Sequence, residues 1–278
     1  MLVSARGFEF DVFEGGPEDG MPIVLLHGFP QHSGQWEAIV PALHEAGLRT
    51  IAINQRGYSP GARPVEPAAY ALSECVADVV SIMDALGHSS FHLVGHDWGA
   101  AVAWLLASTA PERVRTLTAI SVPHGQALSK AMRDPESGQR SRSSYMFVFA
   151  DLEKAVPLLL EDDAIRLRAL YLGSGMTEEQ VERYVAPMRE PAALRAALTW
   201  YTAAIQRLSP QPGPVAVPTT LLWSNGDVAL GRTGAEATKE FVTGDYRLIE
   251  LDGISHWIPD QAPQATIDAI LDRVRSVA

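Results

Sequence analysis

Short apolar runs alternate with longer helical patterns along most of this chain of 278 residues. Six runs have the length and the β-branched content of buried strands, at residues 22–26, 49–53, 91–94, 114–120, 219–223 and 246–251. Helical patterns follow these runs, as at 68–86, 98–110 and 261–277. Strands that alternate with helices form a parallel sheet with helices on its faces. The chain is therefore predicted to be an α/β protein with a mostly parallel sheet.

Residues 123–215 interrupt this alternation. They contain helical patterns such as EKAVPLLL, TEEQVERYV and AALRAALTWYTAAIQRL but no convincing strand, and the Pro- and Gly-rich PQPGPVAVP marks their end. We expect a core domain of residues 1–122 and 216–278 with an inserted helical cap, or lid, of residues 123–215. Open α/β sheets bind ligands at the carboxyl ends of their strands, so the cap is expected to cover a pocket there.

The charge of the chain narrows the class of partner. A formal net charge of −11 argues against nucleic acid and against an anionic membrane surface, because both attract clustered Lys and Arg. The sequence shows no signal-peptide pattern, and no apolar run approaches the roughly 18 residues of a membrane span. We expect a cytoplasmic monomer or homodimer that binds a small molecule. The single cysteine, Cys75, lies in a helical pattern and is expected to be buried.

The stretch VGHDWGA, residues 94–100, has the spacing of a nucleophile elbow, the sharp turn between a strand and a helix. Gly95 and Gly99 leave room for a strained turn at Asp97 and for close packing of the strand on the helix. Asp97 could instead be an ordinary helix N-cap. The two interpretations are equally supported by this residue alone, so its partners decide.

A histidine and a second acid follow in the order that an elbow nucleophile requires. Among the eight histidines, His256 in DGISHWIP follows the last predicted strand, and Asp227 in WSNGDVAL follows the strand before it. Asp227 could be a simple turn residue. Bound to one ring nitrogen of His256, however, it would fix the tautomer and leave the other nitrogen free to take a proton from water. We predict a catalytic triad of Asp97, Asp227 and His256.

The loop HGFP, residues 27–30, follows the first predicted strand. In proteins with a nucleophile elbow, a loop at this place supplies one donor of the oxyanion hole. We assign the two donors to the backbone N–H groups of Phe29 and Trp98; an ordinary turn is the alternative. An aspartate is already ionised, so it can attack a saturated carbon with a leaving group and form an alkyl ester. Water activated by His256 would then attack the carbonyl carbon of Asp97, with the oxyanion against the two N–H groups.

Together, HGFP, GHDWGA, the Gly226-Asp227 pair and SHW resemble the epoxide hydrolases of the α/β-hydrolase superfamily, in order and spacing over nearly the whole chain. The resemblance implies the α/β-hydrolase fold and the hydrolysis of small apolar epoxides to vicinal diols. Ala100 and Ala150 depart from the commonest family pattern, which bears on pocket shape. No cofactor or metal is expected, because the histidines do not cluster with Asp, Glu or Cys at ligand spacing.

The resemblance also implies two cap tyrosines that donate hydrogen bonds to the epoxide oxygen. Tyr145 in SSYMFVFA and Tyr201 in LTWYTAA stand in similar contexts. A phenol can donate a hydrogen bond and then a proton to the nascent alkoxide; the alternative is a pair of packed core tyrosines. We expect the pocket to have apolar walls formed by Trp98, Trp200 and Trp257.

Three other activities stay open at this point. Haloalkane or haloacid dehalogenases also use an elbow aspartate, and the indole N–H groups of Trp98 and Trp200 could bind the halide, although Phe29 offers no side-chain donor where haloalkane dehalogenases often have asparagine. A non-catalytic ligand-binding protein would need only the pocket and not the triad. An ester hydrolase is the weakest alternative, because the elbow has no serine.

Overall fold

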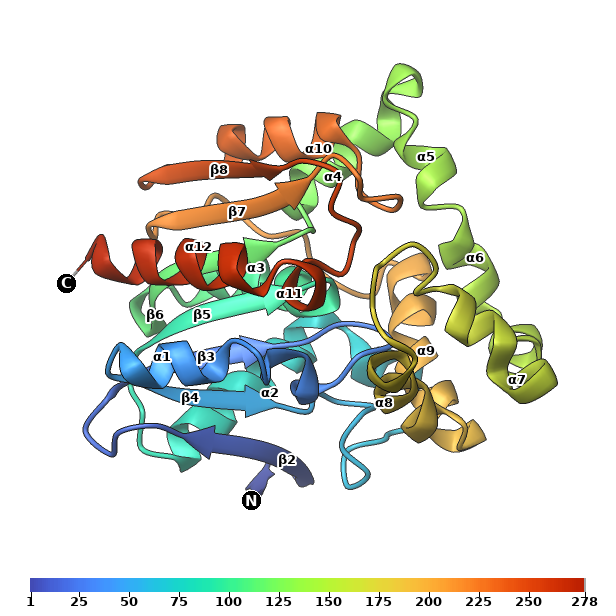
Figure 1. Cartoon of the computed structure of the whole chain (residues 1–278), viewed down its shortest axis with the longest axis horizontal. Coiled ribbons are helices and arrows are strands. Elements are labelled where there is room, and N and C mark those ends of the chain that lie inside the picture. Colours follow the sequence, from blue (N-terminus) through green and yellow to red (C-terminus); the bar gives the residue numbers. More distant parts are fainter. Residues whose placement is uncertain (278) are drawn as a thin grey trace.

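The computed structural model describes residues 1–277, and an eight-stranded sheet forms its centre (Figure 1). The strand order is β1-β2-β4-β3-β5-β6-β7-β8. Strands β3 to β8 are parallel, whereas β1 pairs with β2 and β2 pairs with β4 in antiparallel fashion. The bounds are β1 (Leu2–Ala5), β2 (Phe8–Gly15), β3 (Met21–Leu26), β4 (Leu48–Ile53), β5 (Phe91–His96), β6 (Val114–Ile120), β7 (Thr219–Ser224) and β8 (Tyr246–Leu251).

The six predicted strands are all present, which confirms the predicted fold class. The N-terminal pair β1 and β2 was not predicted. These strands lie at the edge of the sheet, and buried and exposed residues alternate along much of their length. A half-exposed strand lacks the continuous apolar run by which the buried parallel strands were found.

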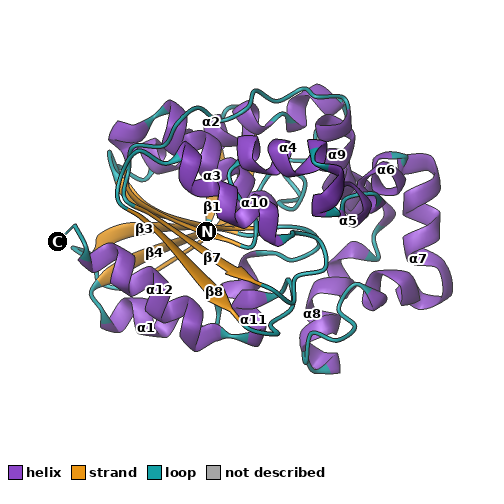
Figure 2. Ribbon diagram, turned by 90° about the horizontal axis from the view of Figure 1, so that it is seen from above, coloured by secondary structure: helices purple, strands orange, loops and turns teal. Residues whose placement is uncertain are grey.

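Two layers of helices cover the sheet (Figure 2). One layer holds α2 (Leu72–Ala85), α3 (Trp98–Thr109), α4 (Gly125–Arg133) and α10 (Arg232–Ala237), and the other holds α1 (Val40–Glu45), α11 (Ile258–Gln261) and α12 (Pro263–Arg275). Cys75 is buried in α2, as predicted. Between residues 1 and 277, no helix combines the length and the apolar composition needed to cross a membrane.

A group of helices lies beyond the carboxyl ends of the strands (Figures 1 and 2). It consists of α5 (Gln139–Arg142), α6 (Tyr145–Ala150), α7 (Leu152–Ala169), α8 (Glu178–Met188) and α9 (Pro191–Ile205). Helix α9 packs against α6 and α7, while α4, the first helix after β6, packs against α10. We propose that residues 123–215 form a cap inserted into a core of residues 1–122 and 216–278, and that α4 at the start of this insertion joins the layer of helices that covers the sheet.

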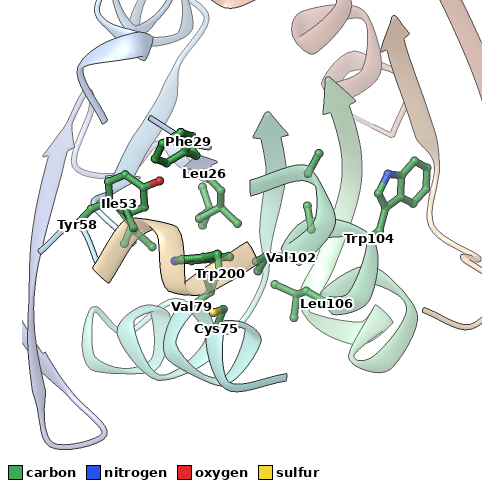
Figure 3. Packing of buried hydrophobic residues seen from close by; sticks show 14 of the residues in the cluster. Leu26, Phe29, Ile53, Tyr58, Cys75, Val79, Val102, Trp104, Leu106 and Trp200 are labelled. Atoms are coloured by element: carbon green, nitrogen blue, oxygen red, sulfur yellow. The ribbon is translucent and has the colours of Figure 1, made fainter. Parts of the chain in front are cut away.

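One hydrophobic core continues from the sheet into the cap helices (Figure 3). Leu26 of β3, Ile53 of β4 and Val79 of α2 belong to this core, and Figure 3 shows Trp200 of α9 among them. The indole of Trp200 is fully buried, and burial of a large apolar side chain contributes about 1.5–3 kcal/mol. This shared core fixes α9 above the strand ends, where the candidate site lies.

Candidate active site

Asp97 occupies a strained turn between β5, which ends at His96, and α3, which begins at Trp98. Its backbone has φ 52° and ψ −121°, a conformation that residues other than glycine rarely adopt. A Cβ atom at Gly95 would lie 2.3 Å from the carbonyl oxygen of Gly99, and one at Gly99 would lie 2.2 Å from that of Leu26. The two glycines are therefore required for the turn.

The loop after β3 supplies a hydrogen bond to the Asp97 carboxylate. The backbone N–H of Phe29 donates to Oδ1 of Asp97 at 2.8 Å, and the N–H of Trp98 also stabilises the charged carboxylate. Gly28 allows this approach, because a Cβ atom there would lie 2.2 Å from Oδ1 of Asp97. Both N–H groups assigned to the oxyanion hole thus face the carboxylate.

His256 lies between two carboxylates. Its Nδ1 is 2.8 Å from Oδ2 of Asp227, and its Nε2 is 3.5 Å from Oδ2 of Asp97. The other carboxylate oxygen of Asp227 accepts the backbone N–H groups of Ala229 and Leu230 at 2.7 and 3.0 Å. The structure therefore brings together the three residues that the sequence places after β5, β7 and β8.

The charges within this trio determine its protonation. Burial by itself would lower the pKa of His256, but the charge and the hydrogen bond of Asp227, joined by Asp97, raise it above its ordinary value. Burial would raise the pKa of Asp97, but the hydrogen bond and charge of His256, together with the Trp98 N–H, hold it below its ordinary value. At neutral pH the resting site therefore contains an imidazolium beside an ionised Asp97.

Tyr145 of α6 and Tyr201 of α9 lie on the cap side, with their ring centroids 6.1 Å apart. Tyr201 packs edge-on against Trp98 at 5.1 Å and against Phe29 at 5.4 Å, the two residues whose N–H groups face Asp97. Burial raises the pKa of both phenols, and the charge of Asp97 raises it further. Both phenols are therefore protonated at neutral pH and can donate hydrogen bonds.

The three tryptophans differ in what their indole N–H groups do. Trp200 donates to the carbonyl of Arg56 at 2.9 Å, and Trp257 donates to that of Leu170 at 3.2 Å. The Nε1 atom of Trp98 is buried without a hydrogen-bond partner among residues 1–277. Trp257 packs edge-on against His256, with centroids 5.1 Å apart, while Trp200 lies behind Trp98 at 5.8 Å.

Two further tyrosines near the site carry no signal in the sequence. The hydroxyls of Tyr58 and Tyr171 are buried without a partner in the described part of the chain. Burial raises the pKa of both, and the charge of Asp97 contributes. Tyr58 packs on His27 at 4.4 Å, and Figure 3 shows its oxygen turned towards Phe29.

A polar network joins the cap to the core beside the site. The carboxylate of Asp260 accepts a hydrogen bond from the hydroxyl of Tyr184 in α8 at 2.7 Å and another from the amide of Gln31 at 2.6 Å. The members of this network are far apart in the sequence, so no local pattern predicts it. Among residues 1–277, no group of three or more His, Cys, Asp or Glu side chains is arranged to hold a metal ion.

Comparisons with known proteins identify relatives of this chain. The family described as alpha/beta hydrolase fold matches residues 21–263. The AB hydrolase superfamily protein YfhM of Bacillus subtilis is 34% identical over 280 residues, which cover 99% of this chain and 97% of that protein. Epoxide hydrolase A of Mycobacterium tuberculosis is 30% identical over 311 residues, which cover 98% of this chain and 95% of that protein.

A solved structure extends the likeness to three dimensions. The crystal structure of epoxide hydrolase A from Mycobacterium thermoresistibile superposes with a TM-score of 0.85 and 25% sequence identity. The match covers 100% of this chain and 98% of the chain in that structure. The family match, the two relatives and this structure all span most or nearly all of the chain. This chain therefore belongs to the α/β-hydrolase family, as a hydrolase related to the epoxide hydrolases.

Proposed function

We propose that this protein opens epoxides to vicinal diols through an ester between the substrate and Asp97. One observation carries the proposal: an ionised carboxylate stands on a nucleophile elbow, 2.8 Å from the Phe29 N–H and 3.5 Å from the His256 ring. Such a nucleophile needs no base, so the histidine is free for a second step. The likeness to epoxide hydrolase A of Mycobacterium tuberculosis supports the same substrate class.

In the first step, a carboxylate oxygen of Asp97 attacks a ring carbon and the carbon–oxygen bond of the epoxide breaks. The departing oxygen carries the electron pair and needs a proton. Tyr145 is partly buried and Tyr201 is buried, and both are protonated phenols on the cap side of the site. One phenol gives its proton to the alkoxide, and the other stabilises the charge with a hydrogen bond.

In the second step, the ester is hydrolysed. Formation of the ester removes the negative charge of Asp97, which is one of the groups that raise the pKa of His256. The imidazolium therefore becomes more acidic and loses a proton, which restores the phenol of the tyrosinate left by the first step. Neutral His256 then takes a proton from the water that attacks the carbonyl carbon of Asp97. Collapse of the intermediate breaks the bond to the substrate oxygen, which takes the proton of the hydroxyl that came from the water. The diol is then released, and the carboxylate and the imidazolium are restored.

The side chains around Asp97 favour an oxygen leaving group over a halide. A departing halide needs at least two convergent N–H donors. The N–H of Trp200 is already bonded to the Arg56 carbonyl, and Phe29 has no side-chain donor, which leaves the indole of Trp98. Two phenols suit an alkoxide, because they can supply a proton as well as hydrogen bonds. The aromatic rings around the site suit an apolar substrate.

The experiment that tests the proposal traps the ester in His256→Ala. This variant keeps the nucleophile but lacks the base, so we expect alkylation without hydrolysis when it is incubated with a panel of aryl and alkyl epoxides. Intact-protein mass spectrometry should show one adduct with the mass of the whole epoxide, and peptide mapping should locate it at Asp97. His44→Ala, a change in α1, is the matched histidine control and should accumulate no adduct.

The outcomes distinguish the candidate reactions. If a haloalkane gives an adduct without its halogen and no epoxide gives any adduct, the protein is a dehalogenase and the proposal is wrong. An epoxide adduct that persists in Asp97→Ala would show that another residue is the nucleophile. Normal turnover by His256→Ala would contradict the second step.

A further inference from the structure

The backbone carbonyl of His256 is held by three hydrogen-bond donors. The Nε2 atom of His96 lies 2.9 Å from this oxygen, the hydroxyl of Ser121 lies 3.1 Å from it, and the backbone N–H of Ile258 lies 2.9 Å from it. His256 itself lies in the irregular segment between β8 and α11, so neither a sheet nor a regular helix fixes its backbone. The side chains of His96 and Ser121 supply that constraint from other elements of the core.

Both side chains come from the carboxyl ends of neighbouring strands. His96 is the last residue of β5 and directly precedes Asp97, and Ser121 directly follows β6. Ser121 has φ 64°, a left-handed conformation that serine rarely adopts. Asp97 and Ser121 thus both have a strained backbone. Asp97 carries the proposed nucleophile, and Ser121 donates a hydrogen bond to the backbone of His256. Strain of this kind persists where the surrounding structure enforces it.

The ring of His96 acts as a neutral donor. A carbonyl oxygen only accepts hydrogen bonds, which assigns the ring proton to Nε2. Burial, helped by the neighbouring positive charge of His256, lowers the pKa of His96 to about 4, so the ring is uncharged at neutral pH. A neutral ring can lie 5.0 Å from the His256 imidazolium without repelling it.

We propose that His96 and Ser121 are positioning residues for the hydrolytic step, because they fix the backbone from which the His256 ring reaches the water that attacks the ester. The inference rests on the proposed function and adds an assignment to it. Asp97 does not need this support in the first step, since the Phe29 N–H and its own elbow hold it. Among residues 1–277, the His256 ring has a single hydrogen bond of normal length, to Asp227 at Nδ1, so the direction of the ring also depends on its backbone.

The experiment separates the two chemical steps in His96→Phe, His96→Gln and Ser121→Ala. Rapid-quench single turnovers with intact-mass detection give the rate of ester formation and the rate of ester loss. We expect His96→Phe to slow ester loss about tenfold to a hundredfold, as misplacement of a reacting group by an ångström does, with ester formation changed less than about twofold. The ester should then accumulate during turnover. His96→Gln keeps an N–H donor and should recover most of the rate of ester loss.

His92→Phe is the matched control. His92 is a buried histidine in the same strand, four positions earlier, and its Nδ1 atom lies 2.8 Å from the hydroxyl of Thr116. Its replacement exchanges a buried imidazole for a phenyl ring and removes a hydrogen bond, but it removes no contact with His256. Both steps should keep their wild-type rates in this variant.

Three results would overturn the inference. Equal losses in ester formation and ester loss would indicate a structural role only, and unchanged rates in both His96→Phe and Ser121→Ala would show that the contacts do not matter. A His96→Gln variant as slow as His96→Phe would exclude the donor role. If His96→Phe does not fold, Ser121→Ala decides, because it removes a single hydroxyl. Absence of any ester in the wild type and in His256→Ala would instead overturn the proposed function itself.

Discussion

The core side and the cap side of the site are held by different forces. On the core side, Asp97 and Asp227 accept backbone N–H groups at 2.7–3.0 Å, and Asp227 in turn orients the His256 ring. On the cap side, Tyr145 and Tyr201 are held by aromatic packing, each with Phe149 as a neighbour, at 5.3 and 5.2 Å. Hydrogen bonds are directional, whereas ring packing fixes position with little constraint on the hydroxyl.

The difference corresponds to what each side does in the proposed reaction. The nucleophile and the base must be aimed at particular atoms, so their directions are fixed before the substrate arrives. The phenols must follow an oxygen that moves as the ring opens, which a rotatable hydroxyl can do. The comparison therefore predicts nearly complete loss of activity from changes on the core side and graded loss from changes on the cap side.

The largest effect is expected from Asp97→Ala. No other side chain on the elbow can form the ester, so turnover of any epoxide should fall by roughly 10⁴-fold or more, as removal of a catalytic nucleophile does. Diol formation measured by chromatography with purified, folded variant tests this. Residual activity within a hundredfold of wild type would contradict the comparison, because a change on the core side would then cause only the partial loss expected on the cap side.

A graded effect is expected from Tyr145→Phe and from Tyr201→Phe. Each change removes one hydroxyl and keeps the ring packing, so ester formation should slow by about tenfold to 10⁴-fold, depending on which phenol gives the proton. Rapid-quench single turnovers should show an unchanged rate of ester loss. Tyr246→Phe in β8 removes another buried hydroxyl without a partner among residues 1–277 and serves as the control. Wild-type rates in both cap variants would remove the phenols from the mechanism.

The core side could be predicted from the sequence because its residues follow recognisable strands. Asp97, Asp227 and His256 come after β5, β7 and β8, and the carboxyl ends of parallel strands meet at one edge of a sheet. Local pattern and sheet topology were therefore enough to predict that they would lie together. The strained conformation of Asp97 was also predictable from the sequence, because Gly95 and Gly99 on either side of it leave room for a sharp turn.

The cap side could not be derived in this way. Tyr145 and Tyr201 were singled out by resemblance, since their places depend on how α6 and α9 pack, which no periodicity gives. The network of Asp260 consists of contacts between segments far apart in the chain, and the burial of the Tyr58 and Tyr171 hydroxyls, which have no partner among residues 1–277, also depends on distant segments. Such contacts have no local signal, because they arise only when the cap has closed on the core.

The smallest effect is expected where the two sides join, at Asp260. Burial raises the pKa of this carboxyl to about 6, well above its ordinary value of 3.8. In the unfolded chain Asp260 ionises near pH 4, whereas in the folded protein it stays protonated up to about pH 6. Folding therefore retains a proton between these values, so the contribution of Asp260 to stability is complete below pH 4 and is lost as the pH rises through 6.

Asp260→Asn removes this titration and nearly preserves the shape of the side chain. The free energy of unfolding of the wild type minus that of the variant should fall by roughly 2–3 kcal/mol from pH 4 to pH 7. Urea unfolding of both proteins at several pH values gives this difference. Buried histidines such as His27, whose pKa burial lowers to about 3, oppose the trend in both proteins and cancel in the subtraction. A difference that is flat, or that grows with pH, would mean that the carboxylate is well solvated at the junction and that the cap and core are not joined through a buried acid.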